Sequence, residues 1–378
     1  MSLAATMHKN KIVISINAAW NIVNFRLGLI RALREAGHEV IALAPADRHS
    51  ARLQALGIPY VPITMDKKGL SPLGDLALLV RYWRILRRLR PDVFLGYTAK
   101  PNVYGSLAAQ ALGIRVINNV SGLGTAFIRK GLLTRIVSTL YRIAFRRSAT
   151  IFFQNEEDRD LFLAEKLVTP RQARLLPGSG IDLERFRPAP EERGKGAFVF
   201  LLIARLLWDK GVGEYVEAAR RVRAVFPEAR FQLLGFLDAE NRTAVPRSAV
   251  EAWVREGIVD YLGEAEDVRP FIATADCVVL PSYREGLPRT LLEAAAMAKP
   301  LIATDVPGCR HAVEAGVNGL LCPARDAGGL AAAMTEMIRA PRSRRERWGQ
   351  AGRARIEREF DEKIVAARYL EAIEEAGG

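Results

Sequence analysis

Short apolar runs alternate with longer amphipathic stretches along the chain. In the first half, the apolar runs predict strands at 11–17, 37–43, 92–96, 115–119, 149–153 and 173–176. The amphipathic stretches between them predict helices near 26–36, 75–89, 101–112, 132–147 and 156–166. Strands that alternate with helices in this way are typical of a doubly wound α/β sheet.

The same alternation restarts at Phe198. It predicts a second set of strands at 198–203, 231–235, 259–263, 277–280, 300–304 and 319–322. Between the two halves, residues 186–196 are rich in proline and charged side chains, which is typical of a linker. The length of 378 residues suits two domains of under about 200 residues each. We therefore expect two Rossmann-like domains, over 1–187 and 188–355.

One segment of the second half has the layout of a ligand-binding site. Residues 281–293 follow a strand-like apolar run and lead into an alanine-rich helix. Ligands of parallel sheets bind outside the carboxyl ends of the strands, where helix N-termini attract anions such as diphosphate. Gly286 allows close approach of backbone to a ligand, and Pro288 suits the start of a helix. Glu285 then lies on the loop, whereas Glu293 lies inside the helix.

Two glutamates separated by seven residues, set in Pro-Ser-x-x-Glu-Gly-x-Pro and then Glu-Ala, resemble the signature of the family 4 retaining glycosyltransferases of GT-B fold. A second block supports the resemblance. The stretch from Arg205 to Gly211 follows the strand predicted at 198–203, and it resembles the Arg-x-x-x-x-Lys-Gly block of the same family. Both blocks lie at strand-to-helix junctions, in the family's order.

The resemblance implies a role for each of these residues. Arg205 and Lys210 clamp the donor diphosphate, because charge that develops on the leaving phosphate needs fixed positive partners. Glu285 orients the sugar and steadies positive charge near the anomeric carbon, while Glu293 holds the ribose. The other donor-binding residues are Gly286, Leu287 and Pro288. The C-terminal domain then binds the nucleotide sugar, the N-terminal domain binds the acceptor, and a helix over 356–378 packs back on the N-terminal domain.

The N-terminal domain departs from the common family pattern. Many members have a Gly-Gly loop after the first strand and a histidine after a later strand, and the matching segments here, 17–26 and 95–102, have neither. Residues 24–26, 98–105 and 121–124 instead resemble the subgroup that extends undecaprenyl-diphosphate-linked sugars in surface polysaccharide or glycan assembly. Thr98 or Lys100 then replaces the histidine, and Arg26 and Lys100 hold either the acceptor diphosphate or the donor phosphates. The acceptor or phosphate candidates are Arg26, Thr98, Lys100, Gly122 and Gly124.

The net charge of +13 is unevenly divided. Residues 1–187 contain 28 lysines and arginines against 13 acids, a surplus of +15, whereas the remainder carries −2. Two predicted helices of the first half are both basic and amphipathic, which is typical of membrane-surface helices. The alternative is that their apolar stripes face the core and their arginines are solvated. The candidate membrane residues are Arg81, Arg84, Arg88, Arg135, Arg142 and Arg146.

Other partners and sites are less favoured. The basic surplus comes with no nucleic-acid-binding motif. The acids at 158–160 lie at a helix start, where they favour the helix dipole rather than a metal. The three cysteines have no metal spacing and leave an odd thiol, which fits a reducing compartment. No signal peptide or run of about 20 uncharged apolar residues is apparent, so we expect a cytoplasmic protein, peripheral on the inner face of the cell membrane, without metal or cofactor.

The resemblance therefore implies a retaining glycosyltransferase that moves a hexose or N-acetylhexosamine, with UDP as the expected carrier, to a lipid-linked saccharide acceptor and forms an α-linkage. One alternative is a non-hydrolysing UDP-N-acetylhexosamine 2-epimerase, which shares the two-domain architecture and needs no lipid acceptor. The other is a non-catalytic membrane-docking nucleotide-binding protein, which would not need the intact Arg205, Lys210, Glu285 and Glu293.

Overall fold

The computed structural model describes residues 9–66, 71–122, 132–188, 196–237, 241 and 243–377. The chain divides into two compact units, one formed by Met1–Gly180 with Glu362–Gly378 and the other by Ile181–Asp361. The boundaries expected at 187 and 355 lie a few residues away. The chain leaves the first unit at Gly180, whose Cα packs so closely on the Glu362 backbone that a Cβ would lie 2.3 Å from the Glu362 Cα.

The described residues of the first unit form a seven-stranded parallel sheet in the order β3-β2-β1-β4-β5-β6-β7. Its strands are β1 (Lys11–Ser15), β2 (Glu39–Ala44), β3 (Tyr60–Pro62), β4 (Val93–Tyr97), β5 (Arg115–Val120), β6 (Thr150–Phe153) and β7 (Ala173–Leu175). Its helices are α1 (Ala19–Phe25), α2 (Leu27–Glu35), α3 (Ser50–Ala55), α4 (Pro72–Leu89), α5 (Ser106–Ala111), α6 (Leu132–Phe145), α7 (Glu156–Ala164) and α15 (Glu362–Glu375), with a π-helical turn η1 (Pro101–Gly105) ahead of α5.

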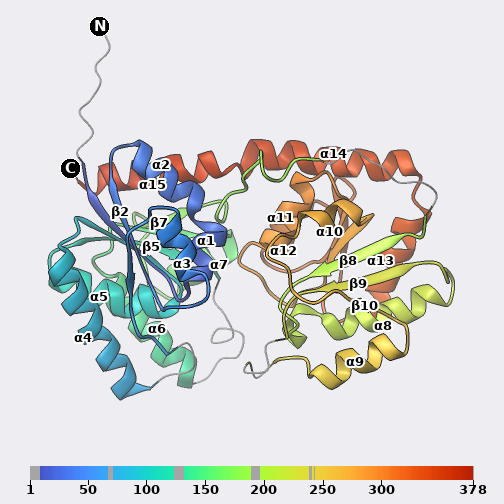
Figure 1. The fold of residues 1–378 in the computed structure, drawn as a ribbon, viewed down its shortest axis with the longest axis horizontal. Helices are drawn as coiled ribbons and strands as arrows, with labels where there is room; N and C mark the ends of the chain where they lie inside the picture. The colour runs from blue at the N-terminus through green and yellow to red at the C-terminus, as the bar shows by residue number, and fades with distance from the viewer. Residues whose placement is uncertain are drawn as a thin grey trace, which may run out of the picture. The chain divides into compact units, whose positions relative to one another are not determined.

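Helices cover both faces of this sheet. Alternate strand residues divide the core, so that Ile12 and Ile14 of β1 pack with α1, α2 and α15, whereas Val13 packs with α4 and α5. Figure 1 shows α4, α5 and α6 gathered along one side of the unit, and α15 beside α2 on the other. The apolar pattern does not predict β3, because three residues that end in proline are too short for a periodic signal.

The described residues of the second unit form a six-stranded parallel sheet in the order β10-β9-β8-β11-β12-β13. Its strands are β8 (Val199–Ile203), β9 (Arg230–Leu234), β10 (Asp260–Tyr261), β11 (Cys277–Leu280), β12 (Leu301–Thr304) and β13 (Gly319–Cys322). Its helices are the 3₁₀ turn η3 (Trp208–Lys210), α8 (Val212–Arg223), α9 (Arg247–Arg255), α10 (Arg269–Thr274), α11 (Arg289–Ala296), α12 (Cys309–Ala312), α13 (Ala327–Arg339) and α14 (Arg342–Glu359).

The doubly wound α/β architecture expected from the sequence is confirmed in both units. The helix expected over 356–378 is instead the end of α14, a break at Phe360 and Asp361, and then α15. In each sheet the strand order reverses beside the first strand, between β1 and β4 in one unit and between β8 and β11 in the other. Connections from two such strands diverge to opposite faces and leave a crevice at their carboxyl ends, where doubly wound proteins bind ligands.

Candidate active site

Lys210 lies at the reversal point of the second sheet, on the short turn η3 that follows β8. The next residue, Gly211, adopts a positive φ of 72°. A Cβ on Gly211 would lie 2.0 Å from the carbonyl oxygen of Pro281, which follows β11. Only glycine therefore lets the connection after β8 pack directly against the connection after β11.

Glu285 meets Lys210 across this junction. The Lys210 Nζ donates to Glu285 Oε1 at 2.5 Å, and the two side chains are only 21% and 14% exposed. The Ser282 hydroxyl donates to the same carboxylate oxygen at 2.6 Å. The structure thus brings together two predicted site residues that are 75 positions apart in sequence. Arg205, at the end of the same strand β8, has an exposed side chain.

The loop that carries Glu285, Gly286 and Leu287 rests on the connection after β12. The Glu285 amide donates to the Pro307 carbonyl at 3.2 Å. Gly308, with a φ of 82°, lies so close that a Cβ would be 2.5 Å from the Glu285 carbonyl oxygen. The sequence reasoning missed Gly308. Its position after Val-Pro at the end of a predicted strand is the signal that could have identified it.

Glu293 lies one and a half turns into α11, and Pro288 is the residue that caps the start of this helix. The Glu293 carboxylate is buried, and its Oε1 accepts a hydrogen bond from Arg289 Nε at 2.7 Å. Burial raises the pKa of the Glu293 carboxyl, whereas Arg289 opposes that rise. The pairing keeps the carboxylate oriented at one helix turn from the loop, and sequence reasoning did not identify Arg289 as its partner.

The predicted residues of the first unit lie at its own reversal point. Thr98, directly after β4, has a φ of 63°, which is strained backbone for a β-branched residue. The Lys100 Nζ is 2.8 Å from Asp75 Oδ1 on α4, and the side chains are 15% and 6% exposed. The positive charge of Lys100 is therefore matched by a buried carboxylate. Burial and the hydrogen bond to Asp75 raise the pKa of the Tyr104 hydroxyl in the same cluster.

Arg26 lies between α1 and α2 and is 4% exposed. Its guanidinium carbon is 4.3 Å from the centre of the Tyr97 ring, at the end of β4. Gly122 follows β5 with a φ of 133°. Gly124 lies outside the described residues.

The candidate membrane residues lie on α4 and α6 or just after α6. Asp75, which is buried, is the only acidic residue in the sequence of these two helices. Arg81 and Arg142 donate to backbone carbonyls, those of Thr64 and Glu165. The side chains of Arg84, Arg88, Arg135 and Arg146 point to solvent. Among the described side chains, the large apolar ones exposed on the same helices are Leu73, Leu76, Val80, Ile136 and Ile143.

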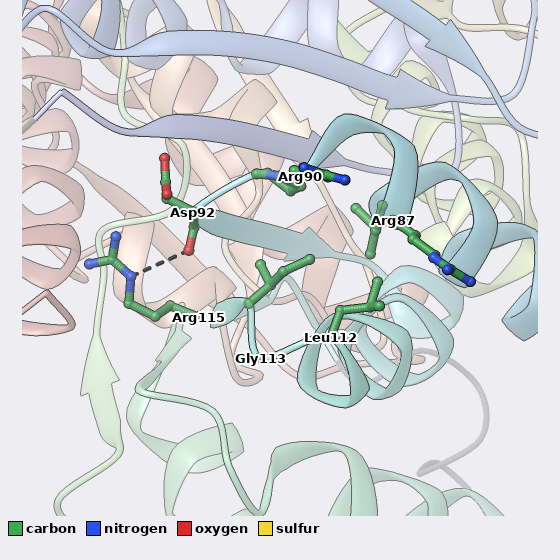
Figure 2. A pocket seen from close by; sticks show the side chains of 9 residues that line it. Arg87, Arg90, Asp92, Leu112, Gly113 and Arg115 are labelled. Atoms are coloured by element: carbon green, nitrogen blue, oxygen red, sulfur yellow. Dashed lines mark hydrogen bonds between the residues drawn. The ribbon is translucent and has the colours of Figure 1, made fainter.

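A surface pocket of about 450 Å³ lies elsewhere in the first unit. Figure 2 shows Arg87, Arg90, Asp92 and Arg115 around it, with the Arg115 Nε donating to the Asp92 carbonyl. Arg87 and Arg90 lie at the C-terminal end of α4, Asp92 precedes β4 and Arg115 begins β5. The pocket therefore lies at the amino ends of these strands, at the edge opposite Thr98. Its arginines favour the negative end of the α4 dipole, and we assign the pocket no part in the candidate site.

Within the described ranges, no group of three or more His, Cys, Asp or Glu side chains is arranged to hold a metal ion. No helix in the part of the chain that the structure describes combines the length and hydropathy needed to cross a membrane.

Comparisons with known proteins agree with this geometry. The profile of the Glycosyl transferase 4-like domain matches residues 22–179, and the profile of Glycosyl transferases group 1 matches residues 197–340. The chain is a GT-B glycosyltransferase. Both matched profiles describe glycosyltransferases, so the epimerase alternative gains no support.

Two proteins are similar to this chain in sequence, and one solved structure is similar to it in fold. The chain is 29% identical over 370 residues, 94% of this chain and 96% of the other, to the N,N'-diacetylbacillosaminyl-diphospho-undecaprenol alpha-1,3-N-acetylgalactosaminyltransferase of Campylobacter jejuni. It is 23% identical to the UDP-Gal:alpha-D-GlcNAc-diphosphoundecaprenol alpha-1,3-galactosyltransferase of Escherichia coli, over 68% of this chain and 69% of that one. The structure of Anabaena Alr3699/HepE in complex with UDP-glucose aligns with a TM-score of 0.81 at 19% identity, over 97% of this chain and all of that one, which supports the GT-B fold.

Proposed function

We propose that this glycosyltransferase transfers a hexose or N-acetylhexosamine from a UDP-sugar to an undecaprenyl-diphosphate-linked saccharide, with retention of configuration and formation of an α-linkage. The observation that carries the proposal is the Lys210–Glu285 pair at the reversal point of the second sheet. The acceptor class is supported by the names of the Campylobacter jejuni and Escherichia coli relatives, and UDP by the latter name and by the UDP-glucose complex of the structural neighbour.

The proposed chemistry occurs on one face of the donor sugar. The bond from the anomeric carbon to the β-phosphate oxygen breaks, and a bond to the acceptor hydroxyl oxygen forms on the same face. The leaving phosphate oxygen accepts the hydroxyl proton, so no side-chain base is required. Lys210 and Arg205 stabilise the charge that grows on this oxygen.

Glu285 and Glu293 have different roles in this proposal. Oε1 of Glu285 accepts bonds from Lys210 and Ser282, and its second oxygen is the one we assign to the sugar hydroxyls. Its negative charge also stabilises the developing positive charge at the anomeric carbon. Glu293, buried behind the loop and oriented by Arg289, accepts the ribose hydroxyls.

A panel of nucleotide sugars, with and without undecaprenyl-diphosphate saccharides, tests this function by the release of nucleoside diphosphate. We expect release from a UDP-sugar that depends on the lipid-linked acceptor, and an α-linked product by NMR. Release that is equally fast without any acceptor, or a β-linked product, would contradict the proposal.

We also propose that α4 and α6 dock the enzyme on anionic membrane at the inner face of the cell membrane. Their exposed leucines and isoleucines can insert at the boundary between lipid headgroups and acyl chains. Their exposed arginines are attracted to the negative headgroups, and each basic residue near the surface contributes about 1 kcal/mol to binding. An enzyme held at the surface gains effective concentration of a lipid-embedded acceptor.

Charge reversal of Arg84, Arg135 and Arg146 to Glu tests this docking. The loss of about 3 kcal/mol should weaken binding to vesicles that contain anionic lipid by at least about 100-fold, while activity on a short water-soluble acceptor persists. The matched control reverses three exposed arginines of the second unit, and should leave vesicle binding largely intact. The control residues are Arg255, Arg339 and Arg347. Equal sedimentation of the two variants with anionic vesicles would show that the α4 and α6 arginines form only a solvated face.

A further inference from the structure

Two unusual features meet at the reversal point of the first sheet. The first is a buried cation. Arg26 is 4% exposed, and its Nε is fully buried without a hydrogen-bond partner in the part of the chain that the structure describes. Among the described residues, its guanidinium makes one hydrogen bond, a long one of 3.4 Å from Nη1 to the carbonyl of the preceding residue, Phe25. No carboxylate among the described residues pairs with it. Buried charges are ordinarily paired, because an unsatisfied charged group is costly to bury.

The second feature is strained backbone. The Arg26 guanidinium lies over the ring of Tyr97, and the next residue, Thr98, has a φ of 63°. Tyr97 is the last residue of β4, so both features lie at the carboxyl end of the strand that neighbours β1 at the reversal of strand order. Backbone strain and orphaned buried donors persist where function requires them.

Lys100, the other predicted cation of this edge, differs from Arg26. Its Nζ is 2.8 Å from a buried carboxylate oxygen of Asp75. A ligand anion at Lys100 would have to compete with Asp75, whereas an anion at Arg26 would satisfy a donor that the protein leaves unsatisfied. The guanidinium also presents a planar fork of donors that matches phosphate oxygens.

We propose that Arg26 binds a phosphoryl oxygen of a diphosphate at the carboxyl end of β4. Arg26 is then a substrate-binding residue of the first unit, and the cost of its burial is recovered when the anion arrives. The identity of the diphosphate rests on the proposed function, which supplies two sources: the lipid diphosphate of the acceptor and the diphosphate of the nucleotide sugar.

Replacement of Arg26 by methionine tests the site, because methionine keeps an unbranched side chain and removes the charge. We expect the unliganded Arg26→Met protein to melt at the wild-type temperature or above, since an unsatisfied buried charge is gone. A structural role for the stack on Tyr97 predicts the opposite, a lower melting temperature. The matched control is Arg31→Met, which removes one exposed arginine from α2.

Binding is measured by calorimetry with three probes: UDP, inorganic pyrophosphate in the presence of saturating UDP, and a short-chain prenyl-diphosphate saccharide. We expect Arg26→Met to lower the affinity for at least one of these probes by about 10- to 100-fold, the range for loss of charge-assisted hydrogen bonds. Arg31→Met should leave the affinity for all three probes unchanged. Loss confined to UDP assigns Arg26 to the donor diphosphate. Loss confined to pyrophosphate and the prenyl diphosphate assigns it to the acceptor.

Unchanged affinity for all three probes overturns the proposal, as does a lower melting temperature with ligand binding retained. If Arg26→Met does not fold, Arg26→Lys keeps the charge but not the planar fork. Arg26→Lys should then lower the affinity for at least one probe by at least about fivefold. Wild-type affinity of this variant for all three probes overturns the proposal. The binding measurements need no turnover. If no acceptor supports nucleotide release but pyrophosphate binding still depends on Arg26, the proposed function fails while the phosphate site stands.

Discussion

Replacement of Lys210 by alanine should lower turnover more than it lowers affinity for free UDP. The ammonium group is 2.5 Å from Glu285 Oε1, so in the free enzyme much of its charge is already matched. A ground-state diphosphate therefore gains only part of the attraction of Lys210. The leaving phosphate carries more charge in the transition state, and loss of one fixed partner there typically costs about 2.7–4 kcal/mol, or roughly 100- to 1,000-fold in turnover. We expect UDP affinity to fall by only about tenfold.

The assay compares turnover, from nucleoside diphosphate release, with UDP affinity from calorimetry. Because Lys210→Ala leaves the largely buried Glu285 carboxylate with Ser282 as its remaining donor among the described residues, stability should fall by roughly 1–3 kcal/mol, and melting curves separate this effect from catalysis. Replacement of the exposed Lys9, which precedes β1, by alanine is the control and should change none of these quantities. Equal losses of turnover and UDP affinity would refute the transition-state role.

Three further predictions follow from contacts in the two units. Glu293→Ala should raise the KM for the donor by roughly 10- to 100-fold with little change in kcat, and wild-type use of a 2′-deoxyribonucleotide donor would contradict the ribose role. Gly308→Ala should lower stability and turnover more than Gly316→Ala, because both residues have positive φ but only a Cβ at Gly308 meets backbone atoms; equal effects would show that φ strain alone matters. Lys100→Met should destabilise the protein by about 3–5 kcal/mol by leaving the Asp75 carboxylate buried without its cationic partner, with partial rescue by Asp75→Asn; unchanged stability in chemical denaturation would contradict the pairing.

The sequence predicts the fold well because apolar runs are local signals. The strands at β8 and β11 are buried along their whole length, so their apolar runs mark them without knowledge of their neighbours. Lys210 and Glu285 are each identified by their motifs, whereas their pairing follows from the strand order, which places the ends of β8 and β11 side by side. Helix α14 runs to Glu359, so the expected boundary at 355 falls inside it.

The remaining features of the site depend on contacts between distant residues. Lys100 is identified by its motif, but its neutralisation depends on Asp75, which lies 25 positions earlier on α4. The stack of Arg26 on Tyr97 joins residues from different elements, and no spacing in the sequence indicates it. Gly308 supports the Glu285 loop from a different strand connection. Sequence patterns therefore predict which residues lie at the strand ends, but not which of their charges are already neutralised.

The cations at the two reversal points therefore differ in whether a carboxylate already pairs with them. In the second unit, Lys210 is paired with Glu285, so a donor diphosphate bound as we propose would compete with a carboxylate for the ammonium group. On the proposed function, we expect Glu285 to lose part of its bond to Lys210 as the phosphate approaches, so that its oxygens become available to the sugar and phosphate binding is coupled to sugar orientation. In the first unit, Arg26 has no acid partner among the described residues to displace. An anion there should bind without such competition, so we expect affinity at Arg26 to be expressed in ground-state binding and the contribution of Lys210 to be expressed mainly in turnover.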